Sequence, residues 1–85
     1  MSIEKYPKIN ESQFTLYCAE ISTGIVLDIN LKYAISQNQK VFTIYDRFDL
    51  AKEEAKRIVA YNDNIECIIS DYSDNAVLVL TKDDL

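Results

Sequence analysis

The side chains of this chain that could carry out chemistry are its carboxylates and its two cysteines, because the sequence contains no histidine. Histidine is the usual general base and a very common metal ligand, so both roles lack their usual residue. A cysteine nucleophile normally needs such a base beside it. Cys18 and Cys67 fall on core-facing positions of strand-like segments, which predicts buried thiols that act as small apolar side chains. A disulfide between them is the less favoured alternative.

The carboxylates occupy positions that ordinary folding explains. Asp46, Asp49 and Glu53 stand at the start of a predicted helix, where acidic side chains interact favourably with the helix dipole. Asp71 and Asp74 stand in or near a predicted turn, which is a usual place for aspartate. A calcium loop needs more oxygen ligands and a glycine at its bend, and a phosphate loop needs several glycines, whereas the chain has one glycine. We therefore expect no catalytic residue, no cofactor and no bound metal.

The charge balance and the polarity of the chain exclude further classes. Nine basic and 14 acidic residues give a formal net charge of −5. An acidic surface repels phosphates, so direct nucleic-acid binding is disfavoured. No apolar run approaches the roughly 20 residues of a membrane-spanning helix, and residues 1–13 are too polar for a signal peptide. The sequence therefore predicts a cytoplasmic protein without a membrane partner.

Residues 14–33 predict a β-hairpin with a two-residue turn at Thr23-Gly24, because the single glycine can adopt the positive φ that such turns need. In this register Cys18 faces Ile29, and the apolar residues sort onto one side of the ladder. Alternation continues beyond residue 33, which favours an extended strand over the helix that residues 30–40 would also allow. Residues 40–46 are rich in β-branched and aromatic side chains and predict another strand.

Residues 65–81 predict a second hairpin with its turn at Asp74-Asn75, since both residues tolerate left-handed backbone geometry. Both faces of this hairpin carry apolar side chains. Asp71 would point towards the core side of the register, so we expect it at the end of the sheet or paired with Arg47.

One amphipathic helix is predicted over residues 46–62. Asp46 is the expected N-cap, with Asp49 as the rival cap. Glu53 and Arg57 are expected to pair at i,i+4 on the outer surface. The apolar stripe of this helix consists of Phe48, Ala51, Ala55, Ile58 and Val59.

Together these elements predict an α+β fold in the order β-β-β-α-β-β. It has a single antiparallel-type sheet of about five strands with one helix packed on one face. We expect a polar N-terminal arm at residues 1–13, one domain at 14–81 and a short acidic tail at 82–85. One helix covers one sheet face, which leaves the opposite face to solvent or to a partner.

The sheet face opposite the helix is predicted to carry an apolar patch with tyrosines. Such patches usually mark a partner surface, and tyrosine is favoured at binding hot spots. The alternatives are that these residues are scattered, or that the arm folds over them through Ile3, Tyr6 and Ile9. The candidate interaction surface consists of Tyr17, Ile21, Val26, Ile68, Tyr72, Val77 and Val79.

Three classes of function remain. The leading hypothesis is a small non-enzymatic protein-interaction module that forms a homodimer through this face or an exposed strand edge. The second is an acidic inhibitor or immunity-type protein that blocks a basic or nucleic-acid-binding target through Asp46, Asp49, Glu53, Asp71 and Asp74. The third and weakest is an enzyme, or a subunit that contributes to a shared site.

Overall fold

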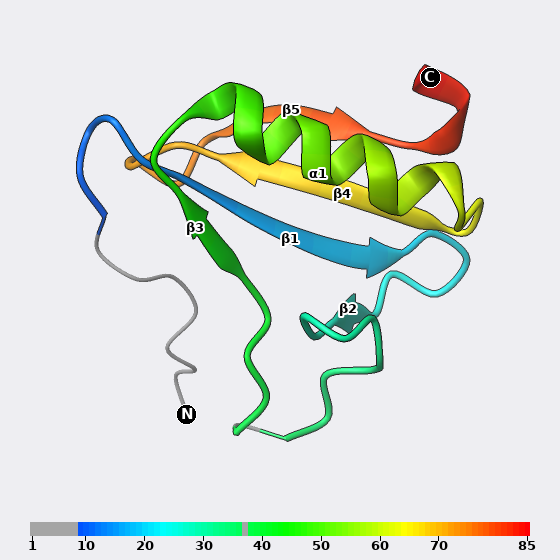
Figure 1. Cartoon of the computed structure of the whole chain (residues 1–85). Coiled ribbons are helices and arrows are strands. Elements are labelled where there is room, and N and C mark those ends of the chain that lie inside the picture. The colour runs from blue at the N-terminus through cyan, green and yellow to red at the C-terminus, as the bar shows by residue number, and fades with distance from the viewer. Residues whose placement is uncertain (1–8, 37) are drawn as a thin grey trace.

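The computed structural model describes residues 9–36 and 38–85, and the predicted α+β fold is confirmed. One antiparallel sheet of five strands carries one α-helix, in the predicted order (Figure 1). The elements are β1 (Phe14–Glu20), β2 (Val26–Leu27), β3 (Thr43–Tyr45), α1 (Phe48–Ala60), β4 (Ile65–Ser70), β5 (Ala76–Leu80) and a short 3₁₀ helix, Lys82–Asp84.

β1 organises the sheet because it has neighbours on both sides. Along one side it pairs with β4 from Thr15 to Glu20. Along the other side β3 pairs with Phe14–Leu16, and β2 pairs with Cys18 and Ala19. β5 lies outside β4 and forms an edge of the sheet.

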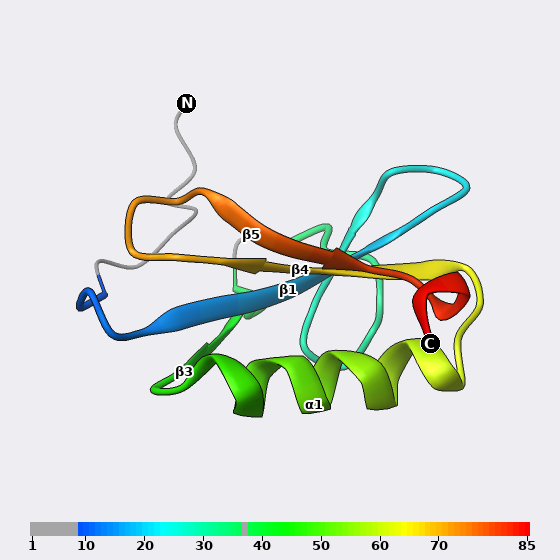
Figure 2. The same cartoon turned by 90° about the horizontal axis from the view of Figure 1, so that it is seen from above.

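α1 forms a second layer on one face of the sheet, as the view from above shows (Figure 2). Ala51, Ala55 and Val59 are completely buried against the strands, and the two alanines let the helix backbone come close to the sheet. At the start of the helix, Phe48 packs edge-on against Phe14 with ring centroids 5.6 Å apart. The core between the layers consists of Leu16, Cys18, Leu27, Ala51, Ala55, Val59, Ile65, Cys67, Ile69 and Leu80.

The predicted caps of α1 are wrong. The N-cap is Arg47, whose side chain makes no capping hydrogen bond. Asp46 instead accepts a hydrogen bond of 2.9 Å from the Gln13 amide, and Asp49 pairs with Arg47 at 2.6 Å. These competing contacts take both carboxylates away from the backbone N–H groups of the first turn.

The pairing predicted on the outer surface of α1 is also different. Arg57 forms its ion pair with Glu54, one turn away at i,i+3. Arg57 is therefore paired with Glu54 and not with the predicted partner, Glu53, which precedes Glu54 on the same helix.

The register predicted for the first hairpin is wrong by two residues. Cys18 pairs with Leu27 and not with Ile29. Gly24 does adopt a positive φ of 76°, as predicted, but the loop is longer than two residues. A shift of two residues keeps the side chains of β1 and β2 on their predicted faces, because side chains alternate with a period of two. Ile29 and Tyr33, which were predicted on the core face, lie after β2 and are exposed.

The longer loop has a cause outside the hairpin. The backbone N–H of Ile21 donates to the carbonyl of Asn64 at 2.8 Å, and the N–H of Ser22 donates to the Asn64 side chain at 3.1 Å. The residues after β1 are therefore held by the start of β4, which removes them from pairing with β2.

The long strand predicted after Leu27 is absent from the described residues, and so is the alternative helix. Asp28 accepts hydrogen bonds from the backbone N–H groups of Asn30 and Lys32, and Leu31 takes a positive φ of 63°. Gln39 donates to the second oxygen of Asp28 at 2.7 Å. This side-chain network folds residues 28–36 and 38–39 into a compact loop, because local hydrogen bonds to an Asp compete with strand pairing.

The second hairpin is also shifted by two residues, with Ile68 opposite Val79. Its loop places Asp74 at φ 63°, so the left-handed geometry is correct but the turn lies earlier than predicted. Asp71 lies just after β4, as expected for the end of the sheet. Its carboxylate accepts from the backbone N–H groups of Ser73 and Asn75, and Arg47, the alternative partner, pairs with Asp49.

Candidate interaction surface

Three rows of cross-strand partners define the far face, which is the sheet face opposite α1. Leu16 and Cys18 of β1 point into the core, so the alternate residues of this strand point away from it. Residues directly opposite one another in neighbouring strands share a face. The rows are Ile44–Thr15–Ser70, Tyr17–Ile68–Val79 and Val26–Ala19–Glu66.

The far face has a buried centre and an exposed apolar rim. Ile68 is buried at the centre, whereas Ile44, Val26 and Val79 are each more than one third exposed. Glu66 is the one charged residue in the three rows. Figure 2 shows the β1–β2 turn rising on this side of the sheet, away from α1. An incoming surface would therefore meet a largely uncharged face bordered by aliphatic side chains.

The structure brings part of the predicted surface together. Tyr17, Ile68 and Val79 form one row across three strands, and Val26 lies in the next row. The other predicted residues lie at the margins. Ile21 directly follows β1, Tyr72 lies in the β4–β5 turn and Val77 lies beside the register shift of β5.

Ile44 belongs to the far face and is missing from the sequence-based set. It pairs with Thr15 and is 41% exposed. The signal that could have found it is alternation along residues 40–46. The neighbouring residue Tyr45 packs against the core, so strict alternation assigns Ile44 to the far face.

The alternative in which the N-terminal arm covers this face falls largely outside the described part of the chain. It depends on Ile3 and Tyr6, which lie outside the described residues, and on Ile9, which is the first residue described. From the described segment, Asn10 and Gln13 form a turn that precedes β1.

The residues of the acidic surface belong to three parts of the fold. Asp46 and Asp49 lie at the start of α1, Asp71 and Asp74 lie at the β4–β5 turn, and Glu53 lies farther along the helix. Figures 1 and 2 agree that the start of α1 and the β4–β5 turn are at the same end of the molecule. Several of these carboxylates are already engaged by Gln13, by Arg47 or by turn N–H groups.

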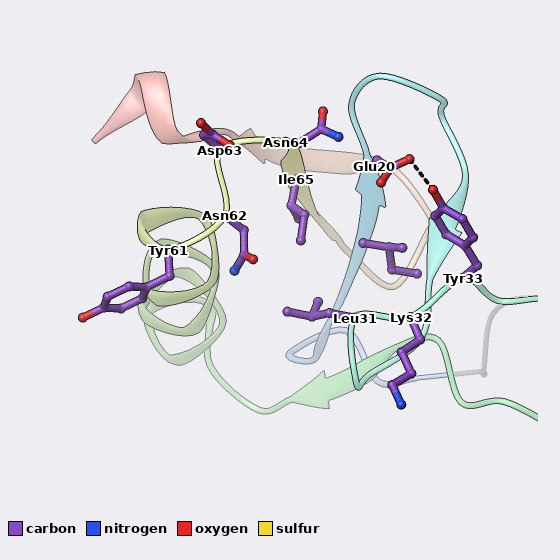
Figure 3. A pocket seen from close by; sticks show the side chains of 10 residues that line it. Glu20, Leu31, Lys32, Tyr33, Tyr61, Asn62, Asp63, Asn64 and Ile65 are labelled. Carbon is purple, nitrogen blue, oxygen red and sulfur yellow. Dashed lines mark hydrogen bonds between the residues drawn. The ribbon is translucent and has the colours of Figure 1, made fainter.

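A groove of about 530 Å³ lies between β2 and the segment that joins α1 to β4 (Figure 3). Leu31 and Ile65 point into it, and Tyr61 points away. On its other wall the Tyr33 hydroxyl donates to Glu20 at 2.8 Å, and this hydrogen bond raises the pKa of Tyr33 above its usual value. Glu20 also accepts from Thr23 through the same oxygen, Oε1.

Within residues 9–36 and 38–85, no three His, Cys, Asp or Glu side chains cluster in a way that could hold a metal ion. Comparison of the chain with protein-family models, with curated proteins and with solved structures finds no match. The part of the chain described here also contains no helix with the length and apolarity to cross a membrane.

Proposed function

We propose that this protein is a small non-enzymatic interaction module that forms a homodimer through the far face. The observation that carries the proposal is the exposed aliphatic rim of the far face, which is formed by Val26, Ile44 and Val79. α1 packs on the opposite face of the sheet.

A second copy of the chain is favoured as the occupant by charge. Each chain has a net charge of −5, so two copies repel wherever their acidic surfaces approach. The three rows of the far face include one carboxylate, Glu66, which makes this face the place where two copies meet with little repulsion. Apolar burial then supplies the driving force.

The scale of such a contact follows from the size of ordinary interfaces. A standard interface buries about 800 Å² on each partner, which is roughly one seventh of the 5667 Å² of the chain. The exposed side chains of Ile21, Ile44, Val26 and Val79 border the face on several strands, so the contact would be made through its rim.

The cytoplasm is the proposed location. Both cysteines are free thiols, and stable structural disulfides are typical of oxidising compartments.

The decisive experiment compares two lysine substitutions at positions of equal exposure. Val79 on the far face is 49% exposed, and Leu50 on α1 is 48% exposed. The mass in solution is measured by light scattering over a range of concentrations. We expect wild type and Leu50→Lys to have twice the chain mass, and Val79→Lys to shift strongly towards the monomer because it buries a charge in the contact.

Two results would contradict the proposal. One is a wild-type monomer at high concentration that Val79→Lys leaves unchanged. The other is an equal loss of dimer in both variants, which would place the contact elsewhere.

The second candidate function is that of an acidic protein that blocks a basic target. It is supported by the common location of the start of α1 and the β4–β5 turn at one end of the molecule. Binding of a lysine-rich peptide should then weaken steeply as salt is raised, and it should weaken further when Asp74 and Asp46 are changed to asparagine. Binding that is insensitive to salt would argue against this candidate.

A further inference from the structure

Two thiols face each other across the central strand pair of the sheet. Cys18 of β1 and Cys67 of β4 are register partners, and their Sγ atoms are 3.1 Å apart. Cys18 is 6% exposed and Cys67 is completely buried. Between residues 9 and 36 and between 38 and 85 these are the two cysteines, and both are in the reduced form.

The backbone already has the spacing that a disulfide needs. Directly opposed residues of antiparallel strands have Cα atoms about 4.5 or 5.5 Å apart, and disulfides span Cα separations of about 4.4–6.8 Å. A bond between Cys18 and Cys67 therefore requires a small approach of the two side chains and no change of strand pairing.

A small recess reaches one of the two cysteines, Cys18. It has a volume of about 70 Å³ and lies where β2 and β3 separate along the outer edge of β1. A water molecule needs about 10–15 Å³ of such space, so a hydroperoxide of two heavy atoms fits, whereas a tripeptide disulfide does not. Cys67 is not among its lining residues, which include Leu16, Cys18, Leu31, Tyr45 and Ile58.

The contact between the sulfur atoms makes the two thiols unequal. The hydrogen bond with Cys67 lowers the pKa of Cys18, although burial and the charge of Glu54 act in the opposite direction. The same hydrogen bond, together with burial, raises the pKa of Cys67. The thiolate is the reactive form of cysteine, and the cysteine that lines the recess is the one whose pKa is lowered.

We propose that Cys18 and Cys67 are a peroxide-reactive pair that closes a disulfide between β1 and β4. Hydrogen peroxide attacks from the recess: the Cys18 thiolate forms an S–O bond, the O–O bond breaks, and hydroxide leaves to give Cys18 sulfenic acid. Cys67 then forms the S–S bond and displaces this oxygen, which leaves as water with the thiol proton. In total two thiols are oxidised, and one peroxide is reduced to two waters.

This reaction would be a property of the folded chain, and it does not depend on the dimer. The two cysteines are 49 positions apart in the sequence, and the fold brings them into contact. A bond between them closes a long loop in the unfolded chain, which stabilises the folded state. The oxidised protein should therefore unfold at a temperature roughly 10–20 °C higher than the reduced protein.

The test uses wild type, Cys18→Ala and Cys67→Ala, each treated with hydrogen peroxide and analysed by intact mass and thiol alkylation. Circular dichroism confirms that each variant is folded. We expect wild type to lose two hydrogen atoms without cross-linked chains, and Cys67→Ala to accumulate a sulfenic acid that dimedone traps at Cys18. Cys18→Ala should stay reduced under the same treatment. Oxidised glutathione should react far more slowly with wild type than peroxide does.

Four results would overturn the proposal. The first is a wild-type protein that stays reduced under conditions that oxidise its urea-unfolded form. The second is oxidation of Cys18→Ala at the wild-type rate, because Cys18 would then not be the reacting sulfur. The third is a disulfide between chains and not within them. The fourth is equal reactivity towards peroxide and oxidised glutathione, since the recess would then not control access. If a variant fails to fold, the comparison of folded with unfolded wild type and the two oxidants still decide the question.

Discussion

The two faces of the sheet are built from the same strands but are completed in different ways. On the helix face, Cys67 and Ile69 of β4 are completely buried beneath α1. On the far face, the rim residues Val26 and Val79 remain more than one third exposed. Alternation along a strand distributes apolar side chains to both sides, but one helix can cover one side. The comparison shows that apolar patterning alone does not say which face is the core.

The largest expected effect distinguishes the faces directly. Ile69→Ala removes a completely buried side chain from beneath α1 and should lower the free energy of unfolding by about 2–5 kcal/mol. Val79→Ala, on the half-exposed rim of the far face, should cost under about 1 kcal/mol in the monomer. Urea denaturation of both variants at low protein concentration measures the difference. Equal losses would mean that the far face is as much a core as the helix face.

An intermediate effect tests the buried centre of the far face. Thr15 is 2% exposed, and its hydroxyl oxygen has no hydrogen-bond partner. A buried polar group without a partner is costly, so Thr15→Val should raise the free energy of unfolding by about 1 kcal/mol. Thr81→Val is the matched control, because its hydroxyl contacts Asp84 at 3.2 Å and its loss should bring no gain. Destabilisation by Thr15→Val would show that this hydroxyl has a partner in solution.

The smallest effect concerns Asp28 in the loop that follows the buried Leu27 of the helix-facing core. The Gln39 amide and the backbone N–H groups of Lys32 and Asn30 hold the pKa of Asp28 below its usual value. Because the pKa of Asp28 is lower in the folded state, its ionised carboxylate stabilises the fold above about pH 4. This contribution is lost as the pH falls further. Asp28→Asn should therefore show a weaker decline in the urea midpoint than wild type between about pH 5 and pH 3. Parallel pH profiles would contradict this role.

The faces of the strands could be predicted from the sequence, although their pairing could not. Both hairpins are shifted by two residues from the predicted register, as with Cys18 opposite Leu27 and Ile68 opposite Val79. Because the shift is even, the core and far-face residues of β1, β2 and β4 stay on their predicted sides. In β5 the alternation is interrupted where the register shifts between Ile69 and Ser70 of β4. The helix stripe was also predicted correctly at Ala51, Ala55 and Val59, which are all buried.

The errors have a common physical origin in polar contacts between distant residues. Asn64 holds the backbone of Ile21, and Gln39 holds Asp28. Nothing in the local pattern of either segment indicates these partners. For the candidate surface, alternation was sufficient to place Tyr17, Ile68 and Val79 on one face. Their alignment in one row, the turn that contains Tyr72 and the contribution of Ile44 required the structure.

The pairing of β1 with β4 has a consequence for how the chain reaches its native state. Partners such as Cys18 and Cys67 are 49 positions apart, so this ladder carries a high entropic cost of loop closure and slows folding. We expect α1 and the β4–β5 hairpin, which depend on local contacts, to collapse first and β1 to dock last. During synthesis β1 leaves the ribosome before β4 exists, so the first strand translated would be the last to be incorporated into the sheet.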